Sequence, residues 1–295
     1  MKRILVTGSN GFIAGYVVEE LQRRDYTPIG LARSKRSYPH LEGVEVYTGD
    51  IRDKAFLTGI IHNIDGVIHT AAMLGTGENM SSSKEFVENN ILGALNVVEI
   101  CNNYNIPLTY ISVGNYTMNN PYSITKTTIE RFMAMAIENG KKQGKRVNMN
   151  IVRALNAFGP RQKISNIKKI VPTFINAAIN NEPLYVYGGK DKCSKMDMVY
   201  VGDVAHVLVD QLENMQKQTF PFLVEAGTGK AYSVYEIAEK VVKFSKSKSL
   251  IVPTPMRLGE PEQSVVVAKN PYKHEYADFD KTLKQTINYY KNETR

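Results

Sequence analysis

The segment "VTGSNGFIAG", residues 6–15, constrains the fold more than any other part of the sequence. It overlaps the end of the apolar, β-branched run "RILVTG" (3–8), which is typical of a buried parallel strand. It leads into "FIAGYVVEELQRR" (12–24), whose apolar residues recur with helical periodicity. Gly8 permits a tight turn between the two, and Ala14 stands where the helix packs closely on the strand. This strand, turn and helix predict the beginning of a βαβ unit.

The backbone of this turn is suited to phosphate. Gly11 has no side chain to obstruct a ligand, and the first N–H groups of the following helix have no partner within the helix. A pyrophosphate can therefore approach, and the spacing Gly8-x-x-Gly11-x-x-Ala14 predicts dinucleotide binding. An isolated glycine triplet is usually only a turn, so the prediction depends on the strand before it and the helix after it.

Strands and helices alternate through the first half of the chain. Apolar runs typical of buried strands follow at 27–33, 44–50, 66–72, 107–112 and 147–154. Helical patterns lie at 53–61, 83–104 and about 122–139, the second with candidate N-caps at Ser81, Ser82 and Ser83. This alternation predicts an α/β fold with a doubly wound parallel sheet covered by helices on both faces.

The regular alternation ends near Gly159 and Pro160. We therefore expect a dinucleotide-binding domain over 1–159, with part of 196–216 packing back on it. The remainder, 160–295, is expected to form a smaller mixed α/β lobe.

Composition disfavours several other classes of protein. The chain of 295 residues is 43% apolar and 22% charged, as ordinary soluble domains are, and no apolar run approaches membrane-spanning length. A formal charge of +8 would suit nucleic acid, but the basic residues are scattered, so we expect no nucleic-acid partner. Cys101 and Cys193 offer neither a disulfide framework nor a metal-ligand spacing. We expect no metal site and a reducing compartment, the cytoplasm.

Tyr122 and Lys126 lie one helical turn apart in "NNPYSITKTTIERF" (119–132). Apolar residues continue the same line at helical spacing: Ile129, Met133, Ala136 and Ile137. A lysine on a core-facing stripe needs a partner or a function, because burying its charge is costly. The alternative is a lysine near the helix start whose charge reaches water beside a packed tyrosine.

Short motifs in a consistent order along nearly the whole chain carry a family resemblance. They are "TGSNGFIAG" (7–15), "GDIRD" (49–53), "IHTAA" (68–72), "NNILGALNVVE" (89–99), "YSITK" (122–126), "RALNAFGPRQ" (153–162), "MDMVYVGDVA" (196–205), "EAGTGKAYSVYEIAEKV" (225–241) and "RLGE" (257–260). The sequence resembles the extended short-chain dehydrogenase/reductases, in particular the NAD(P)-dependent nucleotide-sugar epimerase/dehydratase group. The resemblance implies a Rossmann sheet with a smaller substrate-binding lobe.

The resemblance also implies roles for individual residues. Cofactor contacts are implied for Gly8, Asn10, Gly11, Phe12, Ile13, Asp50, Ile51, Ala71, Ala72 and Lys126. Tyr122 would exchange a proton with a sugar hydroxyl, while Lys126 lowers the pKa of the phenol and holds the nicotinamide ribose. Asn156 and Arg257 would contact the nucleotide sugar, Arg257 through its bidentate guanidinium.

Ser112 is the best match for the family's third catalytic residue, a Ser or Thr just after a strand. Only nine residues separate it from Tyr122, so the loop that covers substrate in typical members is shortened. If the shortening lies before Tyr116, Gly114 takes the place of the serine and the hydroxyl is lost. A strand-end serine bonded to backbone is the structural alternative for Ser112.

Ala32 stands where NAD-preferring members carry an acid for the ribose 2′-hydroxyl. It is followed by Arg33, Lys35 and Arg36, whose charges suit a 2′-phosphate. We therefore favour NADP(H) bound through Arg33, with NAD(H) as the alternative if these residues form only a solvated basic loop.

Two reactions remain open at this stage. Val113 and Gly114 follow Ser112 where family dehydratases carry Asp-Glu, so a 4,6-dehydratase is not expected. NADP(H) tilts the prediction towards reduction of a nucleotide-4-ketosugar, with 4-epimerisation through tightly bound NAD(P) as the alternative. A non-catalytic NADP(H)-binding redox sensor is a third class, although such proteins usually lack the Tyr/Lys pair.

A second apolar stripe, formed by Ile124, Phe132 and Met135, runs along the helix that carries Tyr122. Two apolar faces on one helix indicate burial on both sides. Members of the family dimerise through the helices that correspond to 83–104 and 122–139, so we expect a homodimer.

Overall fold

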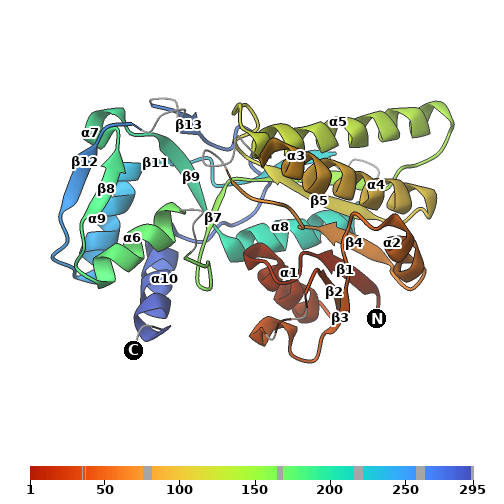
Figure 1. The fold of residues 1–295 in the computed structure, drawn as a ribbon, viewed down its shortest axis with the longest axis horizontal. Coiled ribbons are helices and arrows are strands. Elements are labelled where there is room, and N and C mark those ends of the chain that lie inside the picture. Colours follow the sequence, from red (N-terminus) through yellow and green to blue (C-terminus); the bar gives the residue numbers. More distant parts are fainter. Residues whose placement is uncertain are drawn as a thin grey trace. The chain divides into compact units, whose positions relative to one another are not determined.

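The computed structural model describes residues 1–34, 36, 38–75, 82–164, 169–215, 222–256 and 263–293. The chain forms two compact units. The first unit comprises Met1–Ala154 and Val204–Val224, and the second comprises Leu155–Asp203 and Glu225–Arg295. Figure 1 shows the elements of both.

A seven-stranded sheet with the order β10-β6-β5-β4-β1-β2-β3 forms the centre of the first unit. Its strands are β1 (Arg3–Thr7), β2 (Thr27–Ala32), β3 (Glu45–Thr48), β4 (Gly66–His69), β5 (Leu108–Val113), β6 (Met149–Ala154) and β10 (Leu223–Ala226). Every pairing from β3 across to β6 is parallel. The order 3-2-1-4-5-6 is that of the Rossmann fold, which confirms the predicted fold class. The order reverses between β1 and β4, where such sheets bind ligands outside the carboxyl ends of the strands.

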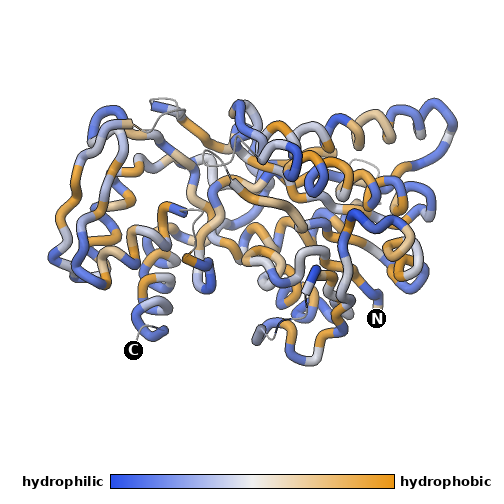
Figure 2. The backbone as a smooth tube through the Cα atoms, in the orientation of Figure 1, coloured by the Kyte–Doolittle hydropathy of each residue, from blue (hydrophilic) through white to orange (hydrophobic). Residues whose placement is uncertain are grey.

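Helices cover both faces of this sheet (Figure 1). The helical elements of the first unit are α1 (Phe12–Arg23), η1 (Pro39–Leu41), α2 (Lys54–Ile61), α3 (Ser83–Phe86), η3 (Val87–Leu92), α4 (Gly93–Asn103), α5 (Pro121–Lys142) and most of α8 (Val201–Asn214). Leu57, Val97 and Ile129, from α2, α4 and α5, are buried in one core cluster with strand residues such as Leu5 and Tyr110. The strands are largely hydrophobic in Figure 2, as a sheet buried on both faces requires.

The helix predicted over 83–104 differs from a regular α-helix. It consists of α3, the π-helix η3 and α4 in succession. Ser82 stands at the N-cap of α3, but its side chain makes no capping hydrogen bond. The π-helix carries Asn90, whose side chain is buried and contacts two other segments, as described below.

The second unit is a smaller mixed α/β body. Its strands are β7 (Asn156–Phe158), β8 (Leu184–Tyr187), β9 (Lys195–Tyr200), β11 (Ala231–Ser233), β12 (Ile251–Thr254) and β13 (Val265–Val266). Its helices are α6 (Ile170–Ile179), α7 (Gly189–Lys192), α9 (Val234–Ser245) and α10 (Phe279–Glu293). A separate core cluster, which includes Phe174, Ile237 and Leu283, holds α6, α9 and α10 together.

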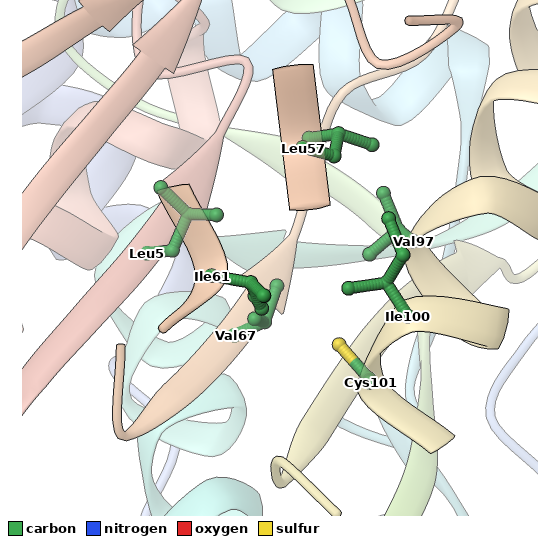
Figure 3. Close-up of a pocket in the computed structure, with 7 residues that line it drawn as sticks. All are labelled: Leu5, Leu57, Ile61, Val67, Val97, Ile100 and Cys101. Carbon is green, nitrogen blue, oxygen red and sulfur yellow. The ribbon is translucent and has the colours of Figure 1, made fainter. Parts of the chain in front are cut away.

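Figure 3 shows a void inside the core of the first unit. It measures about 10 Å³ and is lined by Leu5, Leu57, Ile61, Val67, Val97, Ile100 and Cys101. The lining is apolar and the volume is about that of one water, so this void is a packing defect and no ligand site.

Two properties of the described residues limit the kinds of site to consider. None of their helices is both long and apolar enough to cross a lipid bilayer. Within the same part of the chain, no group of three or more His, Cys, Asp or Glu side chains could hold a metal ion.

Candidate active site

The turn between β1 and α1 has the geometry that the glycine spacing predicts. Gly8 has a φ of +69°, and a Cβ on it would lie 2.8 Å from the Cα of Ala71. Its N–H donates to the carbonyl of Leu31 at 2.7 Å, which ties the turn to β2. A side chain at Gly8 would therefore both strain the backbone and push the β4 loop away. Glycine here keeps the two strand-end loops in contact.

The N-terminus of α1 remains open for an anion. Gly11 is the N-cap, no side chain caps the helix, and its first turn holds no acidic residue. Phe12 and Ile13, the first two helical residues, are half-buried. Asn10 donates through Nδ2 to the carbonyl of Ser34 at 2.9 Å, while its buried Oδ1 has no hydrogen-bond partner among the described residues. An uncapped helix start beside an unpaired amide oxygen fits the polar groups of a dinucleotide.

The loop after β3 holds Asp50 and Ile51 in fixed positions. Arg52 forms a bidentate ion pair with Asp50, and this guanidinium lowers the pKa of the Asp50 carboxyl group. Asn96 of α4 donates to the carbonyls of Ile51 and Arg52 at 3.1 and 3.0 Å. Gly93 lies close beneath the loop, since a Cβ on it would be 2.8 Å from the Ile51 side chain. The motif helix of 89–99 therefore supports the segment predicted to lie beside adenine.

The segment Ala71–Ala72 after β4 is half-buried and held from two sides. The hydroxyl of Thr7 in β1 accepts from the N–H of Ala71 at 3.2 Å. Asn90 accepts from the N–H of Met73 at 2.7 Å and donates to its carbonyl at 3.0 Å. The Asn90 amide also donates to Thr125 on α5 at 3.2 Å, so it joins this segment to the helix of Tyr122. Sequence reasoning missed Asn90 as an individual residue, although it lies within the quoted motif "NNILGALNVVE".

Tyr122 and Lys126 occupy the first turns of α5. Asn120 caps this helix by accepting from the N–H of Ser123 at 2.8 Å, and Pro121 is the first helical residue. Lys126 is only 2% exposed, and its Nζ lies 4.0 Å from the ring centroid of Tyr110 in β5. The predicted core-facing stripe is confirmed, because Lys126, Ile129 and Met133 are all buried.

The pKa values of the pair differ from the sequence-based expectation. Burial raises the pKa of Tyr122 to about 12, whereas Lys126 was expected to lower it. The physical reason is that burial also lowers the pKa of Lys126 to about 7, so much of its population is neutral near neutral pH. A neutral amine cannot stabilise a phenolate electrostatically. In the ligand-free protein, therefore, desolvation is the largest cause of the pKa shifts of both Tyr122 and Lys126.

A buried histidine, His69, also packs against Tyr110. The rings of His69 and Tyr110 are stacked with centroids 5.6 Å apart. The Thr7 hydroxyl accepts two backbone N–H groups, so its own proton points to Nδ1 of His69 at 2.7 Å. Burial and the nearby Lys126 lower the pKa of His69 to about 3. The imidazole is consequently neutral, so Lys126 is the group among His69, Tyr110 and Lys126 that can carry a positive charge near pH 7.

Ser112 lies on the sheet face that α5 covers. It is the ladder partner of Arg153 in the parallel β5–β6 pair, and partners in a parallel ladder point to the same side. Arg153 contacts Glu130 of α5, so Ser112 also faces that helix. The Ser112 hydroxyl is buried and has no hydrogen-bond partner in the described part of the chain, which argues against the purely structural alternative of a backbone bond. Its role, and the competing assignment to Gly114, remain predictions.

The two predicted substrate residues belong to the sequence of the second unit. Asn156 begins β7, and its amide donates to the carbonyl of Asp197 at 3.2 Å. Asp197 is fully buried and accepts from the N–H groups of Thr228, Gly229 and Ala268. Asn156 thus stands on a firmly held strand. Arg257 lies outside the described residues, as does Lys35 of the basic loop.

Together these features define a class of protein. A parallel sheet of order 3-2-1-4-5-6, an open glycine turn at its switch point and a helix that carries a tyrosine one turn before a buried lysine are those of a dinucleotide-dependent short-chain dehydrogenase/reductase. The chain belongs to the NAD dependent epimerase/dehydratase family, whose model matches residues 4–222. The family resemblance drawn from the motifs is thereby confirmed.

Curated relatives cover most of the chain. A UDP-N-acetyl-alpha-D-glucosaminuronate decarboxylase of Bacillus cytotoxicus is 27% identical over 86% of this chain and 84% of its own. A UDP-glucose 4-epimerase of Caenorhabditis elegans is 26% identical over 90% of this chain and 88% of its own. A putative UDP-glucose 4-epimerase of Methanocaldococcus jannaschii is 26% identical over 99% of both chains.

Solved structures share the fold across the whole chain. The UDP-glucose 4-epimerase of Thermotoga maritima with UDP-glucose has a TM-score of 0.85 and 21% identity, covering 99% of this chain and 100% of that one. The UDP-glucose 4-epimerase of Thermus thermophilus with NAD has a TM-score of 0.81 and 24% identity, covering 98% of both.

Proposed function

We propose that this protein is an NAD(P)-dependent 4-epimerase of a nucleotide-activated sugar. One observation carries the proposal: the buried Lys126 lies one helical turn from the half-buried Tyr122 on α5, in a unit that also has an open dinucleotide turn. Lys126 makes no salt bridge with any described residue, and a buried lysine without a direct ion-pair partner is costly to keep. Its retention beside a tyrosine at helical spacing fits a proton-transfer site better than a packing role.

The residues of the first unit fit the cofactor that the family uses. Gly8 and Gly11 would admit the pyrophosphate, Asp50 and Ile51 would border the adenine, and Ala71 with Ala72 would pass the ribose. When bound, the nicotinamide accepts and returns hydride at C4 of the sugar. Tyr122 would take the proton of the 4-hydroxyl and later return it, and the Ser112 hydroxyl would orient the sugar oxygen. Lys126 would assist Tyr122 once a ligand's negative groups favour its charged form.

The relatives favour epimerisation over the reduction that the basic loop suggested. UDP-glucose 4-epimerases recur among the curated relatives and the solved structures, from bacteria, an archaeon and an animal. Reduction of a ketosugar remains the second candidate, because Ala32 ends β2 and the exposed Arg33 follows it. A dehydratase lacks support, since Val113 and Gly114 follow Ser112 where elimination would need an acidic pair.

Turnover assays separate these functions. The protein is supplied with NADPH and a panel of nucleotide-4-ketosugars, and separately with NAD⁺ or NADP⁺ and the 4-hydroxy sugars. We expect inversion at C4 with no net change in absorbance of the nicotinamide. Net NADPH oxidation would instead establish reduction. Cofactor binding without turnover of any sugar would identify a redox sensor.

The cofactor preference is a separate prediction. Arg33 is exposed and directly follows β2. Its positive charge helps to lower the pKa of Asp50 in the loop after β3. We expect NADPH to bind more tightly than NADH, because Arg33 can meet the 2′-phosphate and no acid stands at Ala32. Titration of both cofactors against wild type and Arg33→Ala tests this. Equal affinities in wild type, or no effect of the substitution, would contradict it.

A homodimer is also proposed. Ile124 and Met135 of α5 are each 51% exposed, and Phe132 is 37% exposed. Leu92, at the end of η3, is 53% exposed and adds to the apolar surface of these helices. Such residues are costly to leave in water, and a second copy of the chain would cover them. We expect light scattering to report a dimer at micromolar concentration and Met135→Glu to shift it to monomer. A wild-type monomer would refute the proposal.

A further inference from the structure

Arg153 of β6 joins three segments of the first unit. Its Nε and Nη2 donate to the carboxylate of Glu130 on α5, at 2.9 and 2.5 Å. Its guanidinium carbon also lies 3.9 Å from the ring centroid of Tyr116. Ser112 is its ladder partner on β5. One side chain therefore touches the helix of Lys126 and the loop that leads to Tyr122, while its backbone neighbours Ser112.

Glu130 lies one helical turn beyond Lys126 and is only 7% exposed. Lys126 also faces the aromatic ring of Tyr110 from β5, the neutral His69 from β4 and Tyr122 from its own helix. Of these groups, the Glu130 carboxylate carries the negative charge, and it raises the pKa of Lys126 against the effect of burial. The guanidinium of Arg153 compensates that carboxylate from the sheet side. The distance between the Arg153 guanidinium and the Glu130 carboxylate therefore affects the electrostatic environment that sets the pKa of Lys126.

Tyr116 belongs to the shortened loop between β5 and α5, which spans residues 114–120. The loop connects Ser112 to Tyr122, so its conformation sets how the two hydroxyls are placed. A planar guanidinium that is already fixed by a bidentate carboxylate gives the Tyr116 ring a rigid surface to stack on. This contact anchors the middle of the loop.

We propose that Arg153, Glu130 and Tyr116 form a positioning unit for the Tyr122–Lys126 pair. Arg153 holds the loop before Tyr122 through Tyr116 and compensates the carboxylate beside Lys126. The inference rests on the proposed function of that pair. None of the three is a catalytic residue, because each acts through another group.

The loop contact is tested with a matched pair of variants. Tyr116→Leu removes the aromatic face, whereas Tyr116→Phe keeps the ring and loses only the hydroxyl. We expect amide hydrogen exchange in residues 114–120 to accelerate by about two- to thirtyfold in Tyr116→Leu, the range of a cation–π contact, and to stay near wild type in Tyr116→Phe. Equal exchange in the two variants would overturn this half of the proposal.

The charge contact is tested by the titration of Lys126 itself. In protein labelled with ¹³C at lysine Cε, the Lys126 resonance is identified by its loss in Lys126→Met. Wild type should titrate near pH 7, and Glu130→Gln should move the midpoint to lower pH, because a carboxylate that favours the ammonium is removed. Arg153→Lys keeps a cation beside Glu130 but loses the planar fork. Arg153→Lys should leave the midpoint of the Lys126 titration near that of wild type. It should accelerate amide hydrogen exchange in residues 114–120, as Tyr116→Leu does.

An unchanged midpoint of the Lys126 titration in Glu130→Gln would overturn the proposed effect of Glu130 on Lys126. Unchanged amide hydrogen exchange in residues 114–120 of Arg153→Lys would overturn the shared role of Arg153. Neither measurement requires turnover or a bound ligand. Absence of epimerase activity would therefore count against the proposed function alone, and failure of these titrations against the positioning unit alone.

Discussion

Tyr122→Phe is expected to lower turnover by about two to four orders of magnitude, the usual scale for a lost proton-transfer group. The substitution removes one hydroxyl and keeps a half-buried ring in place, so folding and cofactor binding should be nearly unchanged. Steady-state rates with the sugar that wild type converts, together with cofactor titration, measure both effects. The pair of Tyr122 and Lys126 then has a chemical role that packing alone does not explain.

Two further variants serve as a control and a comparison for Tyr122→Phe. Tyr104→Phe changes an exposed tyrosine at the end of α4 in the same way and should retain full activity. Ser112→Ala should cost less than Tyr122→Phe if the shortened loop admits a water or a substrate hydroxyl in place of the serine. Full activity of Tyr122→Phe would show that the tyrosine and lysine are only neighbours on a helix, and the proposed mechanism would fail.

The sequence predicted the fold of the first unit well because its signals are local. The β-branched run before Gly8, the periodic stripe of α5 and the alternation of strand and helix each depend on residues close in sequence. The ends of elements were predicted less well: β4 ends at His69 rather than at residue 72. The segment beyond it is held by side chains of Thr7 and Asn90, which are distant in sequence.

In the site, too, features that depend on neighbouring residues were predicted, and contacts between residues far apart in sequence were not. Glycine spacing located the turn, and helical spacing located the buried lysine. In the ligand-free protein the pKa of Tyr122 is raised rather than lowered, because the shift depends on how far both groups lose water in the folded protein. Arg153 lies within a quoted motif, but its contacts with Glu130 and Tyr116 arise only when β6, α5 and the loop come together.

Lys126→Met is expected to stabilise the ligand-free protein while weakening cofactor binding. The pKa of Lys126 falls from 10.5 to about 7 on folding, because burial penalises its charge. Between these two values the unfolded chain binds a proton that the folded chain does not, so the free energy of unfolding rises as the pH rises through this window. At pH 7 and below, the burial cost is present almost in full and is on the order of 4 kcal/mol. Methionine fills a similar volume without that cost.

Denaturant unfolding at pH 7 and pH 9 measures this effect. Wild type should gain about 2 kcal/mol over this interval from Lys126 alone, and Lys126→Met should lack that gain. The comparison between the two proteins isolates Lys126. The folded His69 titrates below this interval, since its pKa is lowered to about 3, and Cys101, whose pKa burial raises, contributes equally to both proteins. Lys169, whose pKa burial also lowers, is common to both proteins and cancels in the difference.

The same variant should bind the cofactor more weakly, because Lys126 is assigned to the nicotinamide ribose as well as to Tyr122. A protein that is more stable but binds less well would show that the buried lysine is kept for function at a cost to the fold. If the free energies of unfolding of wild type and Lys126→Met instead change in parallel between pH 7 and pH 9, Lys126 remains charged in the folded protein. The contact with the Tyr110 ring and the carboxylate of Glu130 would then compensate its burial, and the argument from an uncompensated lysine would be wrong.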